Sequence, residues 1–206
     1  MIIFESTSFE ALNLAPRNNE NLLEMIKHPH GIILVVGPTG SGKTTTLYAG
    51  LTILNVKSRN ILTVEDPIEY FIDGIGQTQV NTKVDMTFAR GLRSILRQDP
   101  DILMLGEIRD LETAEIAIKA AQTGHLVLST LHTNSAPETL TRLRNIGVPA
   151  FNLATSINLI VSQRLARRLC ACKENLDIPK AALIEKGFSE EEVDAGIEVY
   201  GPKGCD

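Results

Sequence analysis

A stretch of eight residues that directly follows a short apolar run matches the pattern G-x-x-x-x-G-K-[ST]. Gly37, Gly42, Lys43 and Thr44 occupy its fixed positions. Glycines let a backbone curl until its N–H groups point inward at one phosphate, and a following helix adds its positive N-terminal end. A lysine here reaches the β- and γ-phosphates of a nucleotide, and the next hydroxyl holds Mg²⁺. The sequence therefore predicts a nucleotide site, with Thr44 holding the metal. The expected binding residues are Gly37, Pro38, Thr39, Gly40, Ser41, Gly42, Lys43, Thr44 and Thr45.

A phosphate loop alone does not name a reaction, because hydrolysis also needs a carboxylate near the metal and the attacking water. Such groups are expected at the carboxyl ends of the neighbouring strands. These residues could also have purely structural roles. Acidic residues at strand ends often cap the next helix, as Asp110 would for a helix starting at Leu111, and a lone histidine often lies on the surface. Three apolar runs have acidic or histidine side chains at their ends, and this repetition favours a catalytic role. The candidates are Glu65, Asp66 and Glu69 in "ILTVEDPIEY", Glu107 in "DILMLGE", and His125 and His132 around "HLVLST".

The elements that would position these residues are strands without apolar/polar alternation. Such runs cover residues 32–36, 60–65, 101–107 and 125–130, and strands of this kind are typical of a parallel sheet covered on both faces. Helical patterns separate them, at residues 44–55, 86–98 and 110–124, so we expect an α/β fold with right-handed crossovers. Further on we expect helices over 136–147 and 150–169.

Composition excludes several classes of protein. The chain has 206 residues, 43% of them hydrophobic, which suits one sizeable soluble domain with a small appendage. Its apolar runs are too short to span a membrane, its start does not resemble a signal peptide, and its net charge of −5 gives no bulk attraction to nucleic acid. Three cysteines near the end form no disulfide framework. We expect a cytoplasmic protein.

Arginines supply candidates for a positive group that stabilises the charge of a γ-phosphate. Arg90, Arg93 and Arg97 are spaced i, i+3, i+7, which places them on one face of a helix. Arg59, just before the second apolar run, is a fourth candidate for such an arginine finger. A solvated basic face is the simpler interpretation for any one of them.

Four stretches together resemble a known family. "GPTGSGKTTTLY", "TVEDPIEY", "LRQDPDILMLGEIRD" and "TGHLVLSTLHTN" resemble the Walker A, Asp, Walker B and His boxes of the secretion ATPases, in that order and at similar separations. These are the hexameric motors of type II secretion and type IV pilus assembly. The resemblance covers residues from about Gly31 to Cys170 and implies a RecA-like P-loop core with a mainly parallel sheet and a helical C-terminal extension. Some stretches resemble the pilus-extension enzymes more and others the type II secretion enzymes.

The resemblance also implies roles for individual residues. Glu107 would be the catalytic Walker B glutamate, Glu65 would support Mg²⁺ or the attacking water, and His132 would sense the γ-phosphate. A supporting set would surround them: Asp66, Glu69, His125 and Arg109. The implied partners are further copies of the chain in a homohexamer and an inner-membrane platform protein, with the motor held peripherally at the cytoplasmic side of that membrane.

Two departures from the family pattern affect these expectations. Residues 1–30 resemble only a remnant of the family's N-terminal domain or linker, so we expect a fragment whose P-loop domain covers 31–169. Residues 170–206 would be a truncated cysteine-containing subdomain. Cys170 and Cys172 are one residue closer than the family's C-x-x-C pair, and Cys205 has no following partner. Because structural zinc prefers four ligands, three thiolates predict at most an incomplete zinc site.

The leading interpretation is a ring-forming ATPase that powers pilus assembly or type II secretion. One alternative is an ATP-binding interaction module with little turnover in this short form. A P-loop kinase would leave the Asp and His boxes unexplained and would need a lid for which no insertion is evident. A nucleic-acid translocase is disfavoured by the acidic charge and the lack of a basic stripe.

Overall fold

The computed structural model describes residues 9–204, so Cys205 and residues 1–8 of the predicted N-terminal remnant lie outside the described part. The chain divides into two compact units, one ending at Leu165 and the other beginning at Ala166. The division of the chain into domains at 30/31 and 169/170 stays a prediction. Among the described residues, no helix is long and apolar enough to cross a membrane.

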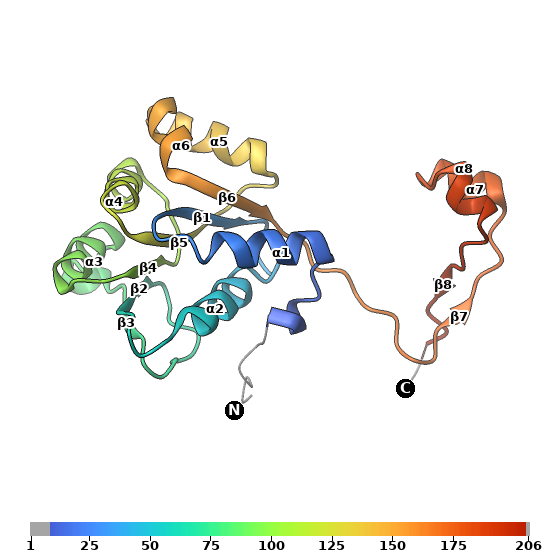
Figure 1. Cartoon of the computed structure of the whole chain (residues 1–206), viewed down its shortest axis with the longest axis horizontal. Coiled ribbons are helices and arrows are strands. Elements are labelled where there is room, and N and C mark those ends of the chain that lie inside the picture. Colours follow the sequence, from blue (N-terminus) through green and yellow to red (C-terminus); the bar gives the residue numbers. More distant parts are fainter. Residues whose placement is uncertain (1–8, 205–206) are drawn as a thin grey trace. The chain divides into compact units, whose positions relative to one another are not determined.

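The larger unit is built on a six-stranded sheet in the order β3-β2-β4-β5-β1-β6, and every neighbouring pair is parallel (Figure 1). The strands are β1 (Gly31–Val36), β2 (Ile61–Glu65), β3 (Gly76–Gln79), β4 (Ile102–Leu105), β5 (Leu126–Leu131) and β6 (Ile157–Ser162). The predicted parallel sheet is confirmed, and its four predicted strands form β1, β2, β4 and β5. The short strand β3 was not predicted, because "GQTQ" has no apolar run.

Helices cover both faces of this sheet. They are α1 (Pro16–Met25), α2 (Lys43–Leu54), α3 (Phe88–Ile95), α4 (Leu111–Gln122), α5 (Ala136–Asn145) and α6 (Ala150–Ser156), with short 3₁₀ turns at Phe9–Leu12, Thr82–Val84 and Leu96–Gln98. Side-chain caps define where several of them begin: Thr87, Asp110 and Ser135 each accept a hydrogen bond from the backbone N–H three residues on. The predicted cap at Asp110 is confirmed.

Alternate residues of β1 belong to two separate cores. Ile32, Leu34 and Val36 pack with α3 and α4, whereas Ile33 and Val35 pack with α1 and α2. Every residue of β1 is buried, because a core covers each face of the strand. This explains the unbroken apolar sequence of the strand: a position that faced water on either side would have favoured a polar residue.

The prediction of one long helix over residues 150–169 is wrong in its second part. Helix α6 ends at Ser156, and the chain continues as β6, which pairs with the outer side of β1. The run "INLIV" favours a strand because β-branched side chains pack well on a pleated surface. An open edge on β1 supplies the partner that this tendency needs, and no local period reveals that edge.

The smaller unit contains a two-stranded antiparallel ribbon and two short helices. Its elements are β7 (Glu174–Asn175), α7 (Lys180–Glu185), α8 (Glu190–Asp194) and β8 (Tyr200–Gly201). A capping box between Ser189 and Glu192 starts α8, and Leu183 and Val193 are buried between the helices. With so few buried apolar residues, this unit depends on capping and turn geometry more than the larger one does.

Two helical glycines provide a matched test of packing. A Cβ atom at Gly91 of α3 would lie 2.8 Å from Cγ1 of the buried Val64, whereas one at Gly50 of α2 would meet nothing within 4 Å. We expect Gly50→Ala to stabilise the unit by ~1 kcal/mol through helix propensity. We expect Gly91→Ala to lower the melting temperature by a few degrees, since overpacking costs about 1–3 kcal/mol. Circular dichroism melts of both variants check this, and equal shifts would contradict the close α3–β2 contact.

Candidate active site

The loop between β1 and α2 has the conformation that its glycines allow. Gly40 and Gly42 adopt φ values of +77° and +83°. A Cβ atom at Gly37 would lie 2.5 Å from the carbonyl oxygen of Gln163, and one at Gly42 would lie 2.8 Å from that residue's side-chain nitrogen. Glycine is therefore required both by the backbone turn and by the close approach of the chain after β6.

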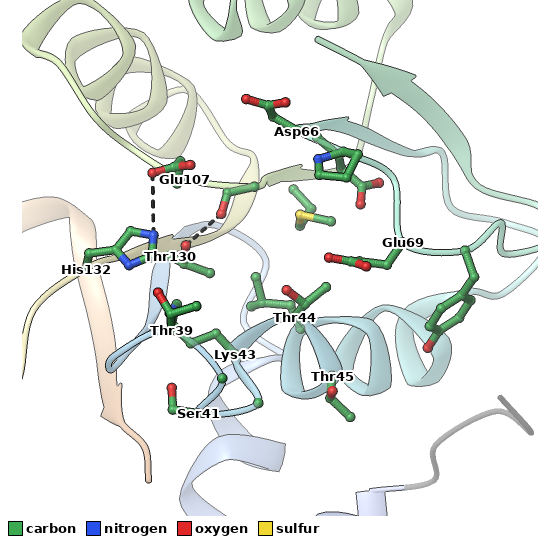
Figure 2. Close-up of a pocket in the computed structure, with 18 residues that line it drawn as sticks. Thr39, Ser41, Lys43, Thr44, Thr45, Asp66, Glu69, Glu107, Thr130 and His132 are labelled. Atoms are coloured by element: carbon green, nitrogen blue, oxygen red, sulfur yellow. Dashed lines mark hydrogen bonds and ion pairs between the residues drawn. The ribbon is translucent and has the colours of Figure 1, made fainter. Parts of the chain in front are cut away.

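This loop forms one wall of a cavity of about 490 Å³ (Figure 2). The other walls come from the segments that follow β2, β4 and β5, whose carboxyl ends meet at the same edge of the sheet. The predicted site residues that line it are Thr39, Gly40, Ser41, Gly42, Lys43, Thr44, Thr45, Glu65, Asp66, Glu69, Glu107 and His132. The fold thus brings the predicted loop together with three of the predicted strand ends.

Lys43 is held by its own loop. Its Nζ donates hydrogen bonds to the carbonyl oxygens of Gly37 at 2.9 Å and Pro38 at 3.0 Å. Burial lowers the pKa of the Lys43 ammonium, and the charge of Glu107 acts in the opposite direction. The nearby Ser41 hydroxyl is buried and has no hydrogen-bond partner among the described residues. A buried cation beside an unsatisfied donor is the environment that a phosphate group would complete.

Glu107 lies between an arginine and a histidine. One carboxylate oxygen accepts a hydrogen bond from Arg109, and the other lies 3.7 Å from His132 Nε2. Arg109 also approaches Asp66, with 3.7 Å between Nη1 and Oδ2, and contact with Glu107 raises the pKa of the guanidinium. Only 15% of the Glu107 side chain is exposed, against 54% of His132. Glu107 is thus positioned on both sides while it borders the cavity (Figure 2).

The carboxylates of the Asp box are in two different environments. Glu65 is 2% exposed and accepts hydrogen bonds from the hydroxyls of Tyr48 and Thr63 and from Gln77 Nε2. Glu69 is exposed, and its carboxylate points into the cavity toward the α2 side (Figure 2). Three donors leave Glu65 about one of its four lone-pair sites for a proton or a metal, whereas the Glu69 carboxylate faces the cavity. The sequence analysis gave Glu65 the role of supporting Mg²⁺ or the attacking water and placed Glu69 in the supporting set, because sequence spacing does not report hydrogen-bond partners.

His125 and the four finger candidates do not line the cavity. His125 precedes β5 and Arg59 precedes β2, so both lie at the opposite edge of the sheet. The remaining three arginines are on or just after α3: Arg90 pairs with Asp85, Arg93 pairs with Glu112 at 2.7 Å, and Arg97 borders a second cavity together with His125. His125 binds the carbonyl oxygen of Ala120 at 2.9 Å through Nδ1, which suits a structural role. A finger acts across a subunit boundary, so its identity stays a prediction.

The cysteine region shows no metal cluster among the residues that the structure describes. No group of three His, Cys, Asp or Glu side chains there could hold a metal ion. Cys172 lies 3.9 Å from the carbonyl oxygen of Gly204, and Cys205 is outside the described residues. The predicted incomplete zinc site therefore stays a prediction.

Sequence reasoning missed two residues that hold the cavity wall. Tyr48 lies one helical turn after Thr44 in α2, and this i, i+4 spacing was the available signal that it faces the same side. Gln77 lies in β3, a strand that was not predicted, so nothing in the sequence indicated its position beside β2.

Comparisons with known proteins agree with this geometry. The family model described as "Type II/IV secretion system protein" matches residues 3–206. The type IV pilus assembly ATPase PilB of Acinetobacter baylyi is 58% identical over 198 residues, which cover 95% of this chain and 34% of the relative. The type II secretion system ATPase E of Vibrio cholerae is 63% identical over 196 residues, which cover 95% of this chain and 38% of the relative. The chain thus spans little more than a third of these curated relatives.

A solved structure shares the fold. The pilus retraction motor PilT, crystallised with bound ADP, superposes with a TM-score of 0.74 at 40% identity, covering 83% of this chain and 52% of that one. This structural similarity supports the RecA-like α/β architecture that the four sequence boxes predict. By the extent of the family match and the agreement of fold and motifs, this chain belongs to the family of type II/IV secretion system proteins.

Proposed function

We propose that this chain is the ATP-hydrolysing core of a motor that drives the assembly of pilin-like subunits, in a type IV pilus or a type II secretion system. The observation that carries the proposal is one cavity that joins the phosphate loop to Glu107, Glu69 and His132. A phosphate-binding loop without these side chains would support binding alone. The names of the relatives, a pilus assembly ATPase and a type II secretion ATPase, support the same activity.

Mg²⁺–ATP is the proposed substrate, and each part of the cavity has a task. The loop N–H groups and Lys43 would bind the β- and γ-phosphates, and the Thr44 hydroxyl would hold Mg²⁺, which neutralises charge on the phosphate oxygens. Glu107 would orient the attacking water. His132, beside Glu107 and mostly exposed, would respond to the presence of the γ-phosphate.

Within the Asp box we propose that Glu69, and not Glu65, acts at the reacting groups. The support is the contrast in environment: the Glu69 carboxylate points into the cavity, while the Glu65 carboxylate is buried among three donors. A group that supports a metal or a water needs free lone pairs at the site. Glu65 would then act through the residues that it binds.

We further propose that the active form is a homohexamer that works with an inner-membrane platform protein from the cytoplasmic side of the membrane. The arginines of α3 support an interface there, because Arg90 and Arg93 are exposed and are paired with the exposed Asp85 and Glu112. Such exposed ion pairs contribute little to stability, so these arginines can exchange their partners for groups of another subunit at small cost. Residues 170–206 would be an accessory subdomain to the core at 31–169.

Substitution of Lys43 tests nucleotide binding. We expect Lys43→Ala to weaken binding of a fluorescent ATP analogue by about 10- to 100-fold, since a hydrogen bond to a charged group contributes roughly 1.5–3 kcal/mol. Lys57→Ala is the matched control, because Lys57 is exposed and outside the cavity. Equal affinities for Lys43→Ala and the control would contradict the proposed phosphate site.

Substitution of Glu107 tests hydrolysis separately from binding. We expect Glu107→Gln to lower the ATP hydrolysis rate by about 100-fold or more while nucleotide affinity stays within a few-fold, because the amide keeps the size but not the charge. Glu24→Gln on the exposed side of α1 is the control. Hydrolysis by Glu107→Gln at the wild-type rate would overturn the catalytic assignment.

The dependence of ATP hydrolysis on protein concentration tests whether the chain acts as a ring. If subunits complete one another's sites, specific activity rises with concentration as a ring-sized species forms in light scattering with Mg²⁺–ATP. Activity that is independent of concentration, from a monomer, would contradict the ring mechanism for this chain. Binding without measurable turnover at any concentration would instead favour the nucleotide-dependent interaction module.

A further inference from the structure

The segment between β2 and β3, residues 66–75, has no regular secondary structure, yet it carries Asp66 and Glu69 at the cavity. A loop of ten residues without helix or strand must be held by side chains if it is to present a carboxylate in one place. The contacts that hold this loop therefore decide where Glu69 lies.

Four side chains outside the loop bind its backbone. Asn55 donates to the Asp73 carbonyl at 2.7 Å, and Gln79 accepts from the Ile68 N–H at 3.4 Å. Tyr48 and Gln77 are the two that bind Glu65 as well.

The Glu69 N–H donates to the Tyr48 hydroxyl oxygen at 3.4 Å. Gln77 binds at two points: its Nε2 donates to the Tyr70 carbonyl at 3.1 Å, and its Oε1 accepts from the Ile72 N–H at 2.7 Å. The ring of Tyr48 also packs edge-on against that of Tyr70, with 4.7 Å between centroids.

The same two side chains meet on the buried carboxylate of Glu65. Tyr48 donates its hydroxyl proton to one oxygen, and Gln77 donates to the other at 3.0 Å. Burial, together with the contact with Glu65, raises the pKa of Tyr48 above its ordinary range. The phenol therefore stays protonated at neutral pH, and this donor to Glu65 does not change with pH in that range.

Tyr48 belongs to the helix that starts at the phosphate loop. Lys43 and Thr44 are in the first turn of α2, and Tyr48 follows one turn later. Tyr48 is fully buried and is not among the residues that line the cavity, so it is not placed to contact a nucleotide there. One rigid helix thus carries both the phosphate-binding groups and the anchor of the Glu69 loop.

We propose that Tyr48 and Gln77, joined through Glu65, are positioning residues that set the place of Glu69 relative to the bound phosphates. The inference rests on the proposed function of the cavity, because it assigns Glu69 a role there. It gives Glu65 a task as well: its charge orients the Tyr48 hydroxyl so that the oxygen can accept the Glu69 N–H.

The test compares Tyr48→Phe with a matched tyrosine variant. Tyr48→Phe keeps the ring contact with Tyr70 and removes the hydroxyl. Tyr200→Phe removes a hydroxyl that also donates to a carboxylate, that of Glu198, but in the smaller unit. We expect Tyr48→Phe to lower kcat by about 10- to 100-fold, as small misplacements of catalytic groups do, with KM for ATP within about twofold. Tyr200→Phe should leave both unchanged.

Hydrogen–deuterium exchange supplies a readout that does not depend on activity. Tyr48→Phe should speed exchange in a peptide covering residues 66–75, while peptides from β4 and β5 keep wild-type protection. Because Glu65 loses a donor in this variant, Tyr48→Phe with Glu65→Gln is a second variant that carries no buried charge. The loop should still exchange faster in it.

The outcomes separate this inference from the proposed function. If the wild type hydrolyses no ATP, the proposed function fails, but faster exchange confined to residues 66–75 still supports the positioning contacts. Unchanged loop exchange in both Tyr48 variants would overturn the inference even in an active enzyme. Faster exchange over the whole larger unit, with KM rising as kcat falls, would also overturn it, because Tyr48 would then be a general stability residue.

Discussion

The common direction of the six strands in the larger unit is the constraint on which the rest of the site depends. Parallel strands cannot be joined by tight turns, so each connection must return across a face of the sheet, usually as a helix. The carboxyl ends of β1, β2, β4 and β5 consequently meet at one edge, and the residues that follow them come from four distant parts of the chain. Only there can a phosphate loop, two sets of carboxylates and a histidine share one cavity.

The balance of charge at this edge limits the form in which a polyphosphate could bind there. Its lining includes Lys43 as a cation but also four carboxylates, those of Glu65, Asp66, Glu69 and Glu107. Arg109 offsets part of this charge by contacting both Glu107 and Asp66. Negative phosphates beside exposed carboxylates would repel one another without a divalent cation between them, which agrees with Mg²⁺–ATP, rather than free ATP, as the proposed substrate.

The parts that could be predicted from sequence are those that local pattern controls. The phosphate loop, the four apolar strands, the Asp110 cap and the places of Glu107 and His132 follow from short motifs and strand direction. The errors concern partners that are distant in sequence. Strand β6 depends on the open edge of β1, and the contrast between Glu65 and Glu69 depends on Tyr48 and Gln77. His125 was grouped with His132, although six residues of β5 separate them and carry them to opposite edges of the sheet.

The hydrogen bonds of Lys43 to Gly37 and Pro38 have a consequence for selectivity among anions. Because Lys43 Nζ donates to two carbonyl oxygens of its own loop, an anion that binds this ammonium exchanges hydrogen bonds with it, and the net gain per contact is smaller than for a free lysine. A small anion such as inorganic phosphate offers few contacts in return, whereas a nucleotide triphosphate adds interactions with the loop N–H groups, Ser41 and the bound metal. We therefore expect this loop to discriminate among anions by the number of contacts that each one makes, and not by charge alone.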